Sequence, residues 1–594
     1  MARSGLLVSA TVLVAVLLSV GCGGGGGGQD STGNPIPAGP APPAAIAINA
    51  SDGQVALLWS ARSGAAHYNV KRATVSAGPY TQLSSPTASS YSDTLVSAGT
   101  TYFYEVSAVD SAGEGANSLP VSATPAAPAT GSVSVDATAI IAPISAALFG
   151  TNLAVWFDIT NPVASQAVAA LGAHLVRWPG GSFSDGYHWQ TNTQCGGGAN
   201  GNSTFDNFMH DVAIPNHVEV AITVDYGSNA ACNGGGDPAE AATWVAYAVS
   251  KGYNAYVHHY TVGNENYGSW EMDLHAKQWD PLTYATAVGT ATGGGYYQQM
   301  KAQDPSAKVG VVVQAVSSWD TTVLSQAAYD FVELHQYPGT PGAESDSALL
   351  TAAPASITAA INTVRAELAA AGHPDTPIFV GEYNSVYSDP GKQTLSIVNG
   401  LFAGETLGEL LNDNIPMAAM WIASGDACRA GLDTSSYAAG LYGWQNFGSY
   451  TQVSDGWAAG ACNSASQSIA AGTPLPSATA QQLAAAFATQ GNSMLTVSVG
   501  ATLPKVRAYA ATSGSGFALM LFNLDPAASF AVTVDVTHTS KVSFTASTLT
   551  YGKLQYDDSI NGLWTAPVTK SLGTLSAPVT VTLPPWSMTV LKLQ

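Results

Sequence analysis

Residues 146–475 alternate short apolar stretches with stretches of helical character. The apolar stretches are rich in Val, Ile and aromatic residues, which is typical of parallel strands buried on both faces. They lie at 148–153, 173–178, 219–225, 255–262, 308–313, 331–335, 378–380 and 418–422. Helical stretches such as 239–249 and 352–371 separate most of them. Eight units in this rhythm predict a (β/α)8 TIM barrel.

Two of these apolar stretches end in a glycine that is followed closely by a glutamate, Glu265 in the fourth and Glu382 in the seventh. A carboxylate at the end of a buried strand is costly unless it is paired or used. Catalytic groups of TIM barrels lie at this end of the strands. Strands four and seven face each other across a closed eight-stranded barrel, so we expect the two carboxylates to meet at its mouth. Such a pair suits a retaining glycoside hydrolase, in which one carboxylate attacks the sugar and the other transfers protons.

Other side chains near the strand ends could assist this chemistry. The candidate substrate-binding residues are Asn152, Arg177, Ser182, Asn264, His335, Tyr337 and Trp421. Asn264 could bind a sugar 2-hydroxyl, Tyr337 could donate to the nucleophile, and His335 could tune the acid/base. The positive charge of Arg177 would lower the pKa of the nucleophile, and Trp421 offers a stacking face for a sugar ring. Arg177 could equally be a structural ion-pair partner, and Trp421 could belong to the barrel core.

The first residues of the chain have the features of an export signal. Arg3 precedes an apolar stretch at 6–18, which ends in small residues and Cys22. This layout predicts a cleaved signal peptide over residues 1–22. Its end resembles the lipobox of bacterial lipoproteins, in which the cysteine thiol is acylated, although Leu18 lies four residues before Cys22 rather than three. An ordinary secretory signal is the alternative. Residues 23–41 are rich in Gly, Ser and Pro and predict a flexible tether.

Two further segments are rich in short strands. Residues 42–125 carry stretches at 55–60, 68–72 and 101–106 separated by turn-rich sequence, and they resemble a fibronectin type III β-sandwich. Residues 126–145 are expected to be a linker with a strand at 132–136 that joins a C-terminal sheet. Residues 476–594, with apolar stretches at 517–523 and 579–591, predict a second β-sandwich.

The four cysteines beyond Cys22 fall into two local pairs in loop-like sequence. We expect the disulfides Cys195–Cys232 and Cys428–Cys462, because an exported chain meets an oxidising environment. The sequence has no Cys-x-x-Cys motif or His-rich cluster that would predict a metal site.

The charge of the chain restricts its partners. The formal net charge is −21, and charged residues make up 10% of the chain. Nucleic acid and anionic membrane surfaces would be repelled, so membrane association is expected only through an N-terminal lipid anchor. A neutral polysaccharide or oligosaccharide is compatible with this charge. Carboxylate chemistry requires no cofactor, and none is predicted.

The ordered set of residues at the strand ends resembles clan A glycoside hydrolases. Segments 175–189 and 262–270, with Arg-Trp-Pro-Gly-Gly at 177–181 and Gly-Asn-Glu at 263–265, are similar to the α-L-arabinofuranosidases of family 51. The resemblance covers roughly residues 130–594 and implies Glu265 as acid/base and Glu382 as nucleophile. Ser182 stands where that family has a sugar-binding Asn, and Asn266 stands where it usually has Met. Endo-acting cellulases and xyloglucanases of family 44 have a similar Arg-Trp-Pro-Gly-Gly motif, so a resemblance to that family is the open alternative.

The leading hypothesis is an exported, lipid-anchored or secreted retaining glycoside hydrolase that acts on plant or microbial polysaccharide and is arabinofuranosidase-like. An endo-β-glucanase, xyloglucanase or xylanase of the same clan is the alternative within this class. A non-catalytic glycan-binding surface lipoprotein is the alternative from another class, although a binder has no need of both carboxylates. The sugar, the linkage and exo or endo action are left open, because barrel loops determine them.

Overall fold

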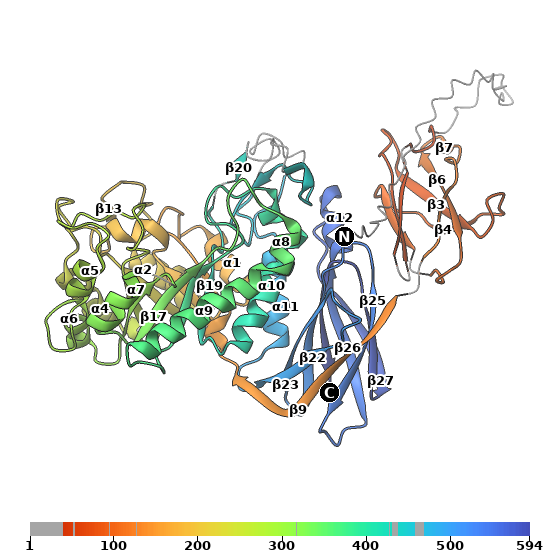
Figure 1. The fold of residues 1–594 in the computed structure, drawn as a ribbon. Helices are drawn as coiled ribbons and strands as arrows, with labels where there is room; N and C mark the ends of the chain where they lie inside the picture. The colour runs from red at the N-terminus through yellow and green to blue at the C-terminus, as the bar shows by residue number, and fades with distance from the viewer. Residues whose placement is uncertain are drawn as a thin grey trace, which may run out of the picture. The chain divides into compact units, whose positions relative to one another are not determined.

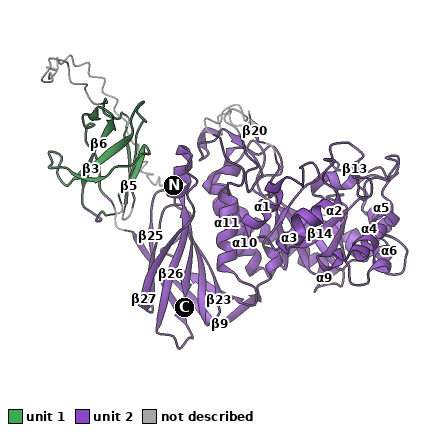
Figure 2. Ribbon diagram, turned by 180° about the vertical axis from the view of Figure 1, so that it is seen from behind, with its two compact units in different colours: residues 1–50, 55–96, 100–124 green, residues 51–54, 97–99, 125–594 purple. Residues whose placement is uncertain are grey.

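The computed structural model describes residues 40–44, 46–51, 54–93, 95–125, 128–315, 318–426, 428–430, 438–457 and 468–594. The predicted signal peptide with Cys22, and the tether up to residue 39, lie outside these residues. The chain forms two compact units, coloured separately in Figure 2. The first contains Val55–Val96 and Thr100–Thr124, and the second contains Pro125–Gln594.

The first unit consists of two antiparallel sheets around one core. One sheet has the order β1-β2-β5, and the other has the order β4-β3-β6-β7 with β8 against β6. The strands are β1 (Ala47–Ser51), β2 (Gln54–Leu58), β3 (His67–Ala73), β4 (Thr81–Ser84), β5 (Ser90–Asp93), β6 (Tyr102–Asp110), β7 (Gly113–Glu114) and β8 (Val121–Ala123). Leu57 and Trp59 pack with Tyr68, Val70 and Tyr104 in the core between the sheets. The fibronectin type III likeness of this unit stays a prediction.

The second unit begins with a closed barrel of eight parallel strands, so the predicted TIM barrel is confirmed. In barrel order the strands are β10 (Gly150–Asn152), β11 (Leu175–Trp178), β14 (Glu219–Val224), β15 (Val257–Val262), β16 (Lys308–Val313), β17 (Phe331–Gln336), β18 (Ile378–Tyr383) and β19 (Met417–Met420). All eight predicted strands are found, with bounds that differ by at most three residues. Their near-continuous burial is what a parallel sheet covered on both faces requires.

Helices surround the barrel strands (Figure 1). The longer ones are α1 (Pro162–Leu171), α4 (Pro238–Lys251), α5 (Pro281–Val288), α6 (Tyr296–Gln303), α7 (Ser318–Gln326), α9 (Ala353–Ala370), α10 (Ile397–Asn412) and α11 (Pro476–Phe487). Asn161 and Asp237 cap the first turns of α1 and α4, each before a proline whose missing N–H has no helical partner to lose. Left-handed Gly172 and Gly252 end the same two helices. These signals fix where the two helices begin and end.

The second unit also contains a nine-stranded sheet in the order β27-β26-β29-β24-β23-β22-β9-β25-β28. Its strands are β9 (Ala129–Pro143), β22 (Ser493–Val499), β23 (Val506–Ser513), β24 (Gly516–Asn523), β25 (Phe530–Thr537), β26 (Ser543–Gly552), β27 (Val568–Ser576), β28 (Val579–Leu583) and β29 (Ser587–Leu593). Strand β9, which contains the predicted strand 132–136, pairs with both β22 and β25. Side chains of β9, β24, β25 and β28 share one core, so the sheet encloses its own apolar interior.

Two features of this region differ from the sequence-based picture. The apolar stretch 579–591 is two strands, because Pro584 and Pro585 lack the N–H groups that a continuous ladder needs. Strand β28 then pairs with β25, whereas β29 pairs with β24 and β26. Residues 476–487, which were assigned to the second sandwich, form α11, which packs against α10 and α1.

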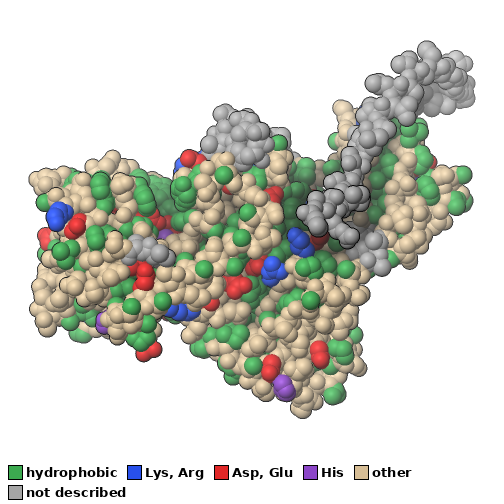
Figure 3. Space-filling view, viewed as in Figure 1, with side chains coloured by type: hydrophobic (Ala, Val, Ile, Leu, Met, Phe, Trp, Pro, Cys, Tyr) green, Lys and Arg blue, Asp and Glu red, His purple; other side chains and the backbone are tan. Residues whose placement is uncertain are grey.

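The surface carries few charges. In the view of Figure 3, acidic and basic side chains are few and lie scattered over the surface. Among the described residues, no helix combines the length and the apolar character that a membrane crossing requires.

Candidate active site

Strand β15 delivers Glu265 to the barrel mouth through a tight turn. Gly263 has a φ of 73°, and a Cβ at this position would overlap the side chain of Asn266. Glu265 itself has a φ of 45°, in the left-handed region that residues other than glycine seldom adopt. Such backbone conformations concentrate at functional sites. The glycine in Gly-Asn-Glu is therefore required by the turn that aims the carboxylate.

Strand β18 delivers Glu382 through a bulge at Gly381. The register pairs Leu334 with Val380 and then His335 with Glu382, so Gly381 is the extra residue. A Cβ on Gly381 would overlap the carboxyl group of Glu333, a fully buried residue of β17. The glycine thus leaves room for Glu333, and the bulge sets Glu382 opposite His335.

The two glutamates meet in one cavity, as the sequence analysis expects. A carboxylate oxygen of Glu265, one of Glu382 and a ring nitrogen of His335 all lie within 4.8 Å of one another. The cavity has a volume of about 960 Å³. Aromatic residues form much of its lining, including Trp156, Phe183, Tyr267, Trp270, Tyr387 and Trp421. A space of this size and character suits a ligand with apolar faces and polar edges.

Arg177 and Tyr337 hold the carboxylate of Glu382. Arg177 Nη1 donates to Glu382 Oε1 over 2.8 Å, and the Tyr337 hydroxyl donates to Oε2 over 2.7 Å. Arg177 is fully buried, so its charge acts on Glu382 with little screening by water. Asn152 is also fully buried, and its side-chain oxygen accepts from Arg177 Nη1 over 3.1 Å. The structure thus gives Asn152 a contact with Arg177 behind the cavity.

Glu265 has different partners. His335 Nδ1 lies 2.8 Å from Glu265 Oε1, and Trp270 Nε1 donates to Glu265 Oε2 over 2.8 Å. Trp270 is 65% exposed, whereas His335 is buried. One oxygen of Glu265 therefore faces a group that can gain or lose a proton, and the other faces an aromatic side chain at the rim.

Glu333 joins the two sides beneath the cavity. Its Oε1 lies 2.6 Å from Arg177 Nε and 2.9 Å from His335 Nε2, and its Oε2 accepts from the hydroxyl of Thr261. We call Glu265, Glu333 and Glu382 the three-glutamate cluster. The two cations that contact it, Arg177 and His335, share a single oxygen of Glu333.

The pKa values of this cluster follow from its charges. Burial lowers the pKa of His335, but the carboxylates of Glu382, Glu265 and Glu333 outweigh it and raise this pKa to about 10. Burial raises the pKa of Glu265, but the hydrogen bond and charge of His335 give a net lowering. The pKa of Glu333 is lowered in the same way, by Arg177 and His335 against burial. At neutral pH the substrate-free site therefore carries its mobile proton on His335.

A second acidic group, the Asp185–Glu271 pair, lies behind Asn264. Glu271 Oε1 accepts from Asn264 Nδ2 over 2.9 Å and from Ser182 Oγ over 2.8 Å, and Asp185 Oδ2 accepts from Asn264 N over 3.1 Å. Burial raises both pKa values well above their usual range, and the charge of Asp185 adds to the rise at Glu271. No Lys, Arg or His of the described chain forms an ion pair with either residue. Both carboxyl groups therefore ionise less readily than ordinary surface acids.

Two groups of side chains have the spacing of metal ligands. One is Glu265, His335 and Glu382. Its atoms already have partners within the protein, because His335 contacts Glu265 and Glu333, and Glu382 accepts from Arg177 and Tyr337. The other group is His188, Cys195 and Cys232, whose sulfurs are bonded to each other and offer no thiolate.

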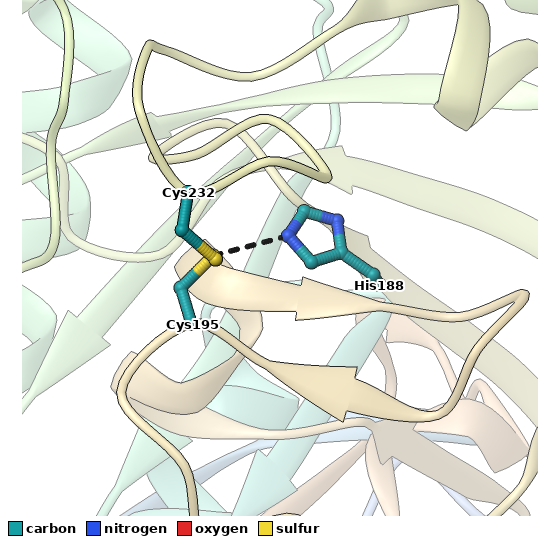
Figure 4. Close-up of side chains that lie close together, drawn as sticks. All are labelled: His188, Cys195 and Cys232. Carbon is teal, nitrogen blue, oxygen red and sulfur yellow. Dashed lines mark hydrogen bonds between the residues drawn. A yellow bond between two sulfur atoms is a disulfide. The ribbon is translucent and has the colours of Figure 1, made fainter.

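The predicted disulfide Cys195–Cys232 is present (Figure 4). It joins the loop after β13 (Thr193–Gln194) to the loop after β14, and His188 Nε2 lies 3.2 Å from Cys195 Sγ. Cys428 is disulfide-bonded, but Cys462 lies outside the described residues, so that pairing stays a prediction.

The sequence-based site residues come together in this region, in two layers. Ser182, Asn264, Glu265, His335, Tyr337, Glu382 and Trp421 line the cavity. Arg177 and Asn152 lie beneath it and act on it through Glu382 and Asn264. Ser182 donates its hydroxyl hydrogen to Glu271, so its oxygen can act toward a sugar only as an acceptor.

Sequence reasoning missed Glu333, Trp270 and the Asp185–Glu271 pair. The sequence does contain an indication for Glu333, because this residue lies in the middle of the apolar stretch 331–335. A carboxylate buried there would be costly unless it were paired. Trp270 and Glu271 lie in a loop, where the sequence gives no indication of side-chain direction.

Comparison with known proteins supports the fold. No protein-family model matches the chain. An amylopullulanase from Thermoanaerobacterium saccharolyticum is 37% identical over 91 residues, which is 15% of this chain and 7% of that protein. The chain thus spans a small fraction of the length of this curated relative.

Solved structures match a much larger part of the chain. The family 51 α-L-arabinofuranosidase of Thermotoga petrophila RKU-1 matches 78% of this chain and 100% of its own, with a TM-score of 0.58 and 18% identity. The α-L-arabinofuranosidase of Thermotoga maritima, in complex with arabinose, matches 78% and 99%, with a TM-score of 0.57 and 17% identity. A family 44 xyloglucanase of Paenibacillus polymyxa matches 78% and 99%, with a TM-score of 0.55 and 14% identity. At these identities the likeness establishes a shared barrel-and-sandwich fold.

Proposed function

We propose that this protein is a retaining glycoside hydrolase with Glu382 as nucleophile and Glu265 as acid/base. The observation that carries the proposal is the pair of carboxylates within 4.8 Å of each other in one cavity. Retaining enzymes hold their carboxyl groups about 5–5.5 Å apart, whereas inverting enzymes need about 6.5–9.5 Å to admit a water between them. The short separation supports double displacement.

The partners of Glu382 suit a nucleophile. Arg177 and Tyr337 each donate to one oxygen of its carboxylate, which fixes its orientation. Attack on the anomeric carbon would form a covalent glycosyl ester and free these donors to stabilise the carboxylate again when it leaves. Both contacts favour the charged form that exists before attack and after hydrolysis.

The partners of Glu265 suit proton transfer. His335 can exchange a proton with Oε1, and Trp270 holds Oε2 in place without a charge of its own. Glu265 would protonate the leaving oxygen in the first step and take a proton from water in the second. Asn264 is fixed between Arg177 and Glu271, which supports its role as a ligand for the sugar 2-hydroxyl.

The cavity supports a substrate longer than one sugar. Trp270 is 65% exposed and Tyr387 is 61% exposed, and both line the cavity from loops that follow different strands, β15 and β18. Exposed aromatic faces are good platforms for sugar rings. We therefore propose an oligosaccharide or polysaccharide substrate, with arabinofuranosides as the first candidates because the sequence motifs at 177–181 and 263–265 resemble that family. A β-glucan, xyloglucan or xylan is the alternative, which the fold of the xyloglucanase neighbour favours.

A substrate screen tests the function directly. Aryl α-L-arabinofuranoside, β-xyloside and β-glucoside should be assayed beside arabinoxylan, xyloglucan and β-glucan. We expect release of aryl alcohol or reducing sugar with at least one of them, and none with Glu382→Ala. Near-normal turnover by Glu382→Ala would contradict the proposal.

A non-catalytic glycan-binding protein is the rival. It has no use for two carboxylates held with separate proton and charge partners. Isothermal titration that shows tight binding of one of these glycans, together with no reducing-sugar release over long incubation, would favour this rival.

We also propose that the protein is exported and anchored by acylated Cys22. The disulfide between Cys195 and Cys232 supports an oxidising compartment. Metabolic labelling with a fatty acid should mark the wild type and fail to mark Cys22→Ser. Export of an unlabelled wild-type protein would instead support an ordinary secretory signal.

A further inference from the structure

Three side chains form an unbroken line of contacts from beneath the barrel mouth into the cavity. Glu333 Oε1 lies 2.9 Å from His335 Nε2, and His335 Nδ1 lies 2.8 Å from Glu265 Oε1. His335 Nδ1 is farther from the nucleophile, at 3.8 Å from Glu382 Oε2. The His335 ring therefore contacts the proposed acid/base, Glu265, more closely than the proposed nucleophile, Glu382. Glu333 is fully buried and cannot reach the substrate.

We propose that Glu333, His335 and Glu265 form a proton relay, in which His335 stores the proton that Glu265 delivers and Glu333 fixes the ring. Glu333 is then a positioning residue, because it acts through His335. This inference rests on the proposed glycoside hydrolase function.

The relay conserves protons through both halves of the reaction. In the first, the proton on His335 Nδ1 passes to Glu265, which gives it to the glycosidic oxygen while Glu382 bonds to the anomeric carbon. The electron pair of the broken C–O bond stays on the leaving oxygen. In the second, water attacks the anomeric carbon, its proton returns through Glu265 to His335 Nδ1, and Glu382 leaves as a carboxylate. Throughout, the ring keeps the proton on Nε2 that it donates to Glu333.

The charges around His335 explain why the relay needs Glu333. The ring faces Glu265 from β15, Glu382 from β18 and Glu333 from its own strand, and these raise its pKa, while Arg177 from β11 opposes them. Glu265 is neutral while it carries the proton, and Glu382 is neutral while it is a sugar ester, but Glu333 stays a carboxylate beside the ring in both states. The permanent charge of Arg177 is offset at the same oxygen, where its Nε lies 2.6 Å away. Glu333 thus keeps the ring oriented at each stage, whichever of the other two carboxylates is neutral.

The substitution Glu333→Gln tests the relay in the full-length protein. It keeps the size and an oxygen for the ring N–H, but it removes the charge. Rates are compared for the benzyl and the 2,4-dinitrophenyl glycosides of the sugar that the wild type cleaves. Benzyl alcohol needs a proton to leave and dinitrophenolate does not. We expect kcat/KM to fall about 30-fold or more for the benzyl glycoside and less than about 3-fold for the dinitrophenyl glycoside.

The pH profile gives a second readout. In the wild type, the alkaline limb for the benzyl glycoside should follow the pKa of His335, which is about 10. Loss of the Glu333 charge should move this limb to lower pH. Tyr337→Phe is the matched control, because it weakens the support of Glu382 and should slow both substrates equally without moving the limb.

His335→Gln provides an independent test if Glu333→Gln does not fold, since it removes the ring and should show the same difference between substrates. An equal fall on both substrates with an unmoved alkaline limb would overturn the relay. The hydrolase proposal would then still stand if Glu382→Ala is inactive. Absence of turnover by the wild type would overturn both proposals.

Discussion

The three-glutamate cluster and the Asp185–Glu271 pair lie close together at the barrel mouth. Asn264 lies between them, bonded to Arg177 on one side and to Glu271 on the other, yet the pKa values of the two groups shift in opposite directions. Arg177 and His335 contact the three-glutamate cluster, and the pKa values of Glu265 and Glu333 are lowered. No such cation reaches the Asp185–Glu271 pair, and both pKa values there are raised well above their usual range. Burial alone raises carboxyl pKa values, so the placement of two cations decides which acids are ionised.

The opposite pKa shifts separate the carboxylates proposed for catalysis from the carboxyls that hold other side chains in place. The ionised carboxylates of the three-glutamate cluster can attack or exchange protons. The carboxyls of the Asp185–Glu271 pair, whose pKa values are raised, accept hydrogen bonds that hold Asn264 and Ser182 in place. Substitutions that remove charge should therefore be severe in the first cluster and mild in the second.

Glu382→Ala should have the largest effect. It removes the proposed nucleophile and leaves Arg177 with one carboxylate fewer, so kcat should fall at least about 10⁴-fold. Initial rates on the substrate that the screen identifies measure this. Retention of more than a few per cent of the rate would show that the ionised cluster is not the chemical centre.

Glu265→Ala should be next and should depend on the leaving group. General acid–base catalysis contributes about 10²–10⁴-fold, so natural glycosides should slow by this factor. An aryl glycoside with a good leaving group should form the covalent intermediate at nearly the wild-type rate and then stall. Added azide should restore turnover by attacking the intermediate without a general base. Equal slowing of both substrate types, with no effect of azide, would assign Glu265 to another role.

Tyr337→Phe should have an intermediate effect. It removes one charge-assisted hydrogen bond to Glu382, a contact of about 1.5–3 kcal/mol, which corresponds to about 10–150-fold in rate. Steady-state kinetics should show the loss in kcat/KM. An unchanged rate would mean that Arg177 alone holds the nucleophile.

Glu271→Gln should have the smallest effect on rate, within about 3-fold, because an amide oxygen can accept from both Asn264 and Ser182 as the carboxyl oxygen does. Its effect on stability should depend on pH. Because the pKa of Glu271 is raised in the folded state, its contribution to wild-type stability is complete below its pKa in the unfolded state. This contribution is lost as the pH rises toward the folded-state pKa, by up to about 1.4 kcal/mol per pH unit.

Thermal unfolding at several pH values checks this. From about pH 5 upward the variant should become progressively more stable relative to the wild type. A stability difference that does not change with pH, or a large loss of activity, would mean that Glu271 is ionised and belongs with the catalytic carboxylates.

Much of this arrangement could be predicted from the sequence. The eight barrel strands follow from their apolar stretches, because a strand buried on both faces has few alternatives in composition. Glu265 and Glu382 were found because each ends such a strand. Glu333 has the same chemical peculiarity but lies inside its strand, two residues before His335, so a search of strand ends passes over it.

Other features depend on contacts that a sequence does not encode locally. The bulge at Gly381 is the consequence of Glu333 lying against it from the neighbouring strand. Trp270 reaches Glu265 because a loop turns back over the mouth. The raised pKa values of Asp185 and Glu271 result from burial without a cation, which depends on the whole fold.

The most direct test of the account is the intact mass of Glu265→Ala during turnover of a dinitrophenyl glycoside. Without its base the enzyme should accumulate the covalent intermediate, so the mass should rise by one sugar residue, and peptide mapping should locate the sugar on Glu382. Rapid product release with an unchanged mass, or a sugar attached to another residue, would contradict the double displacement.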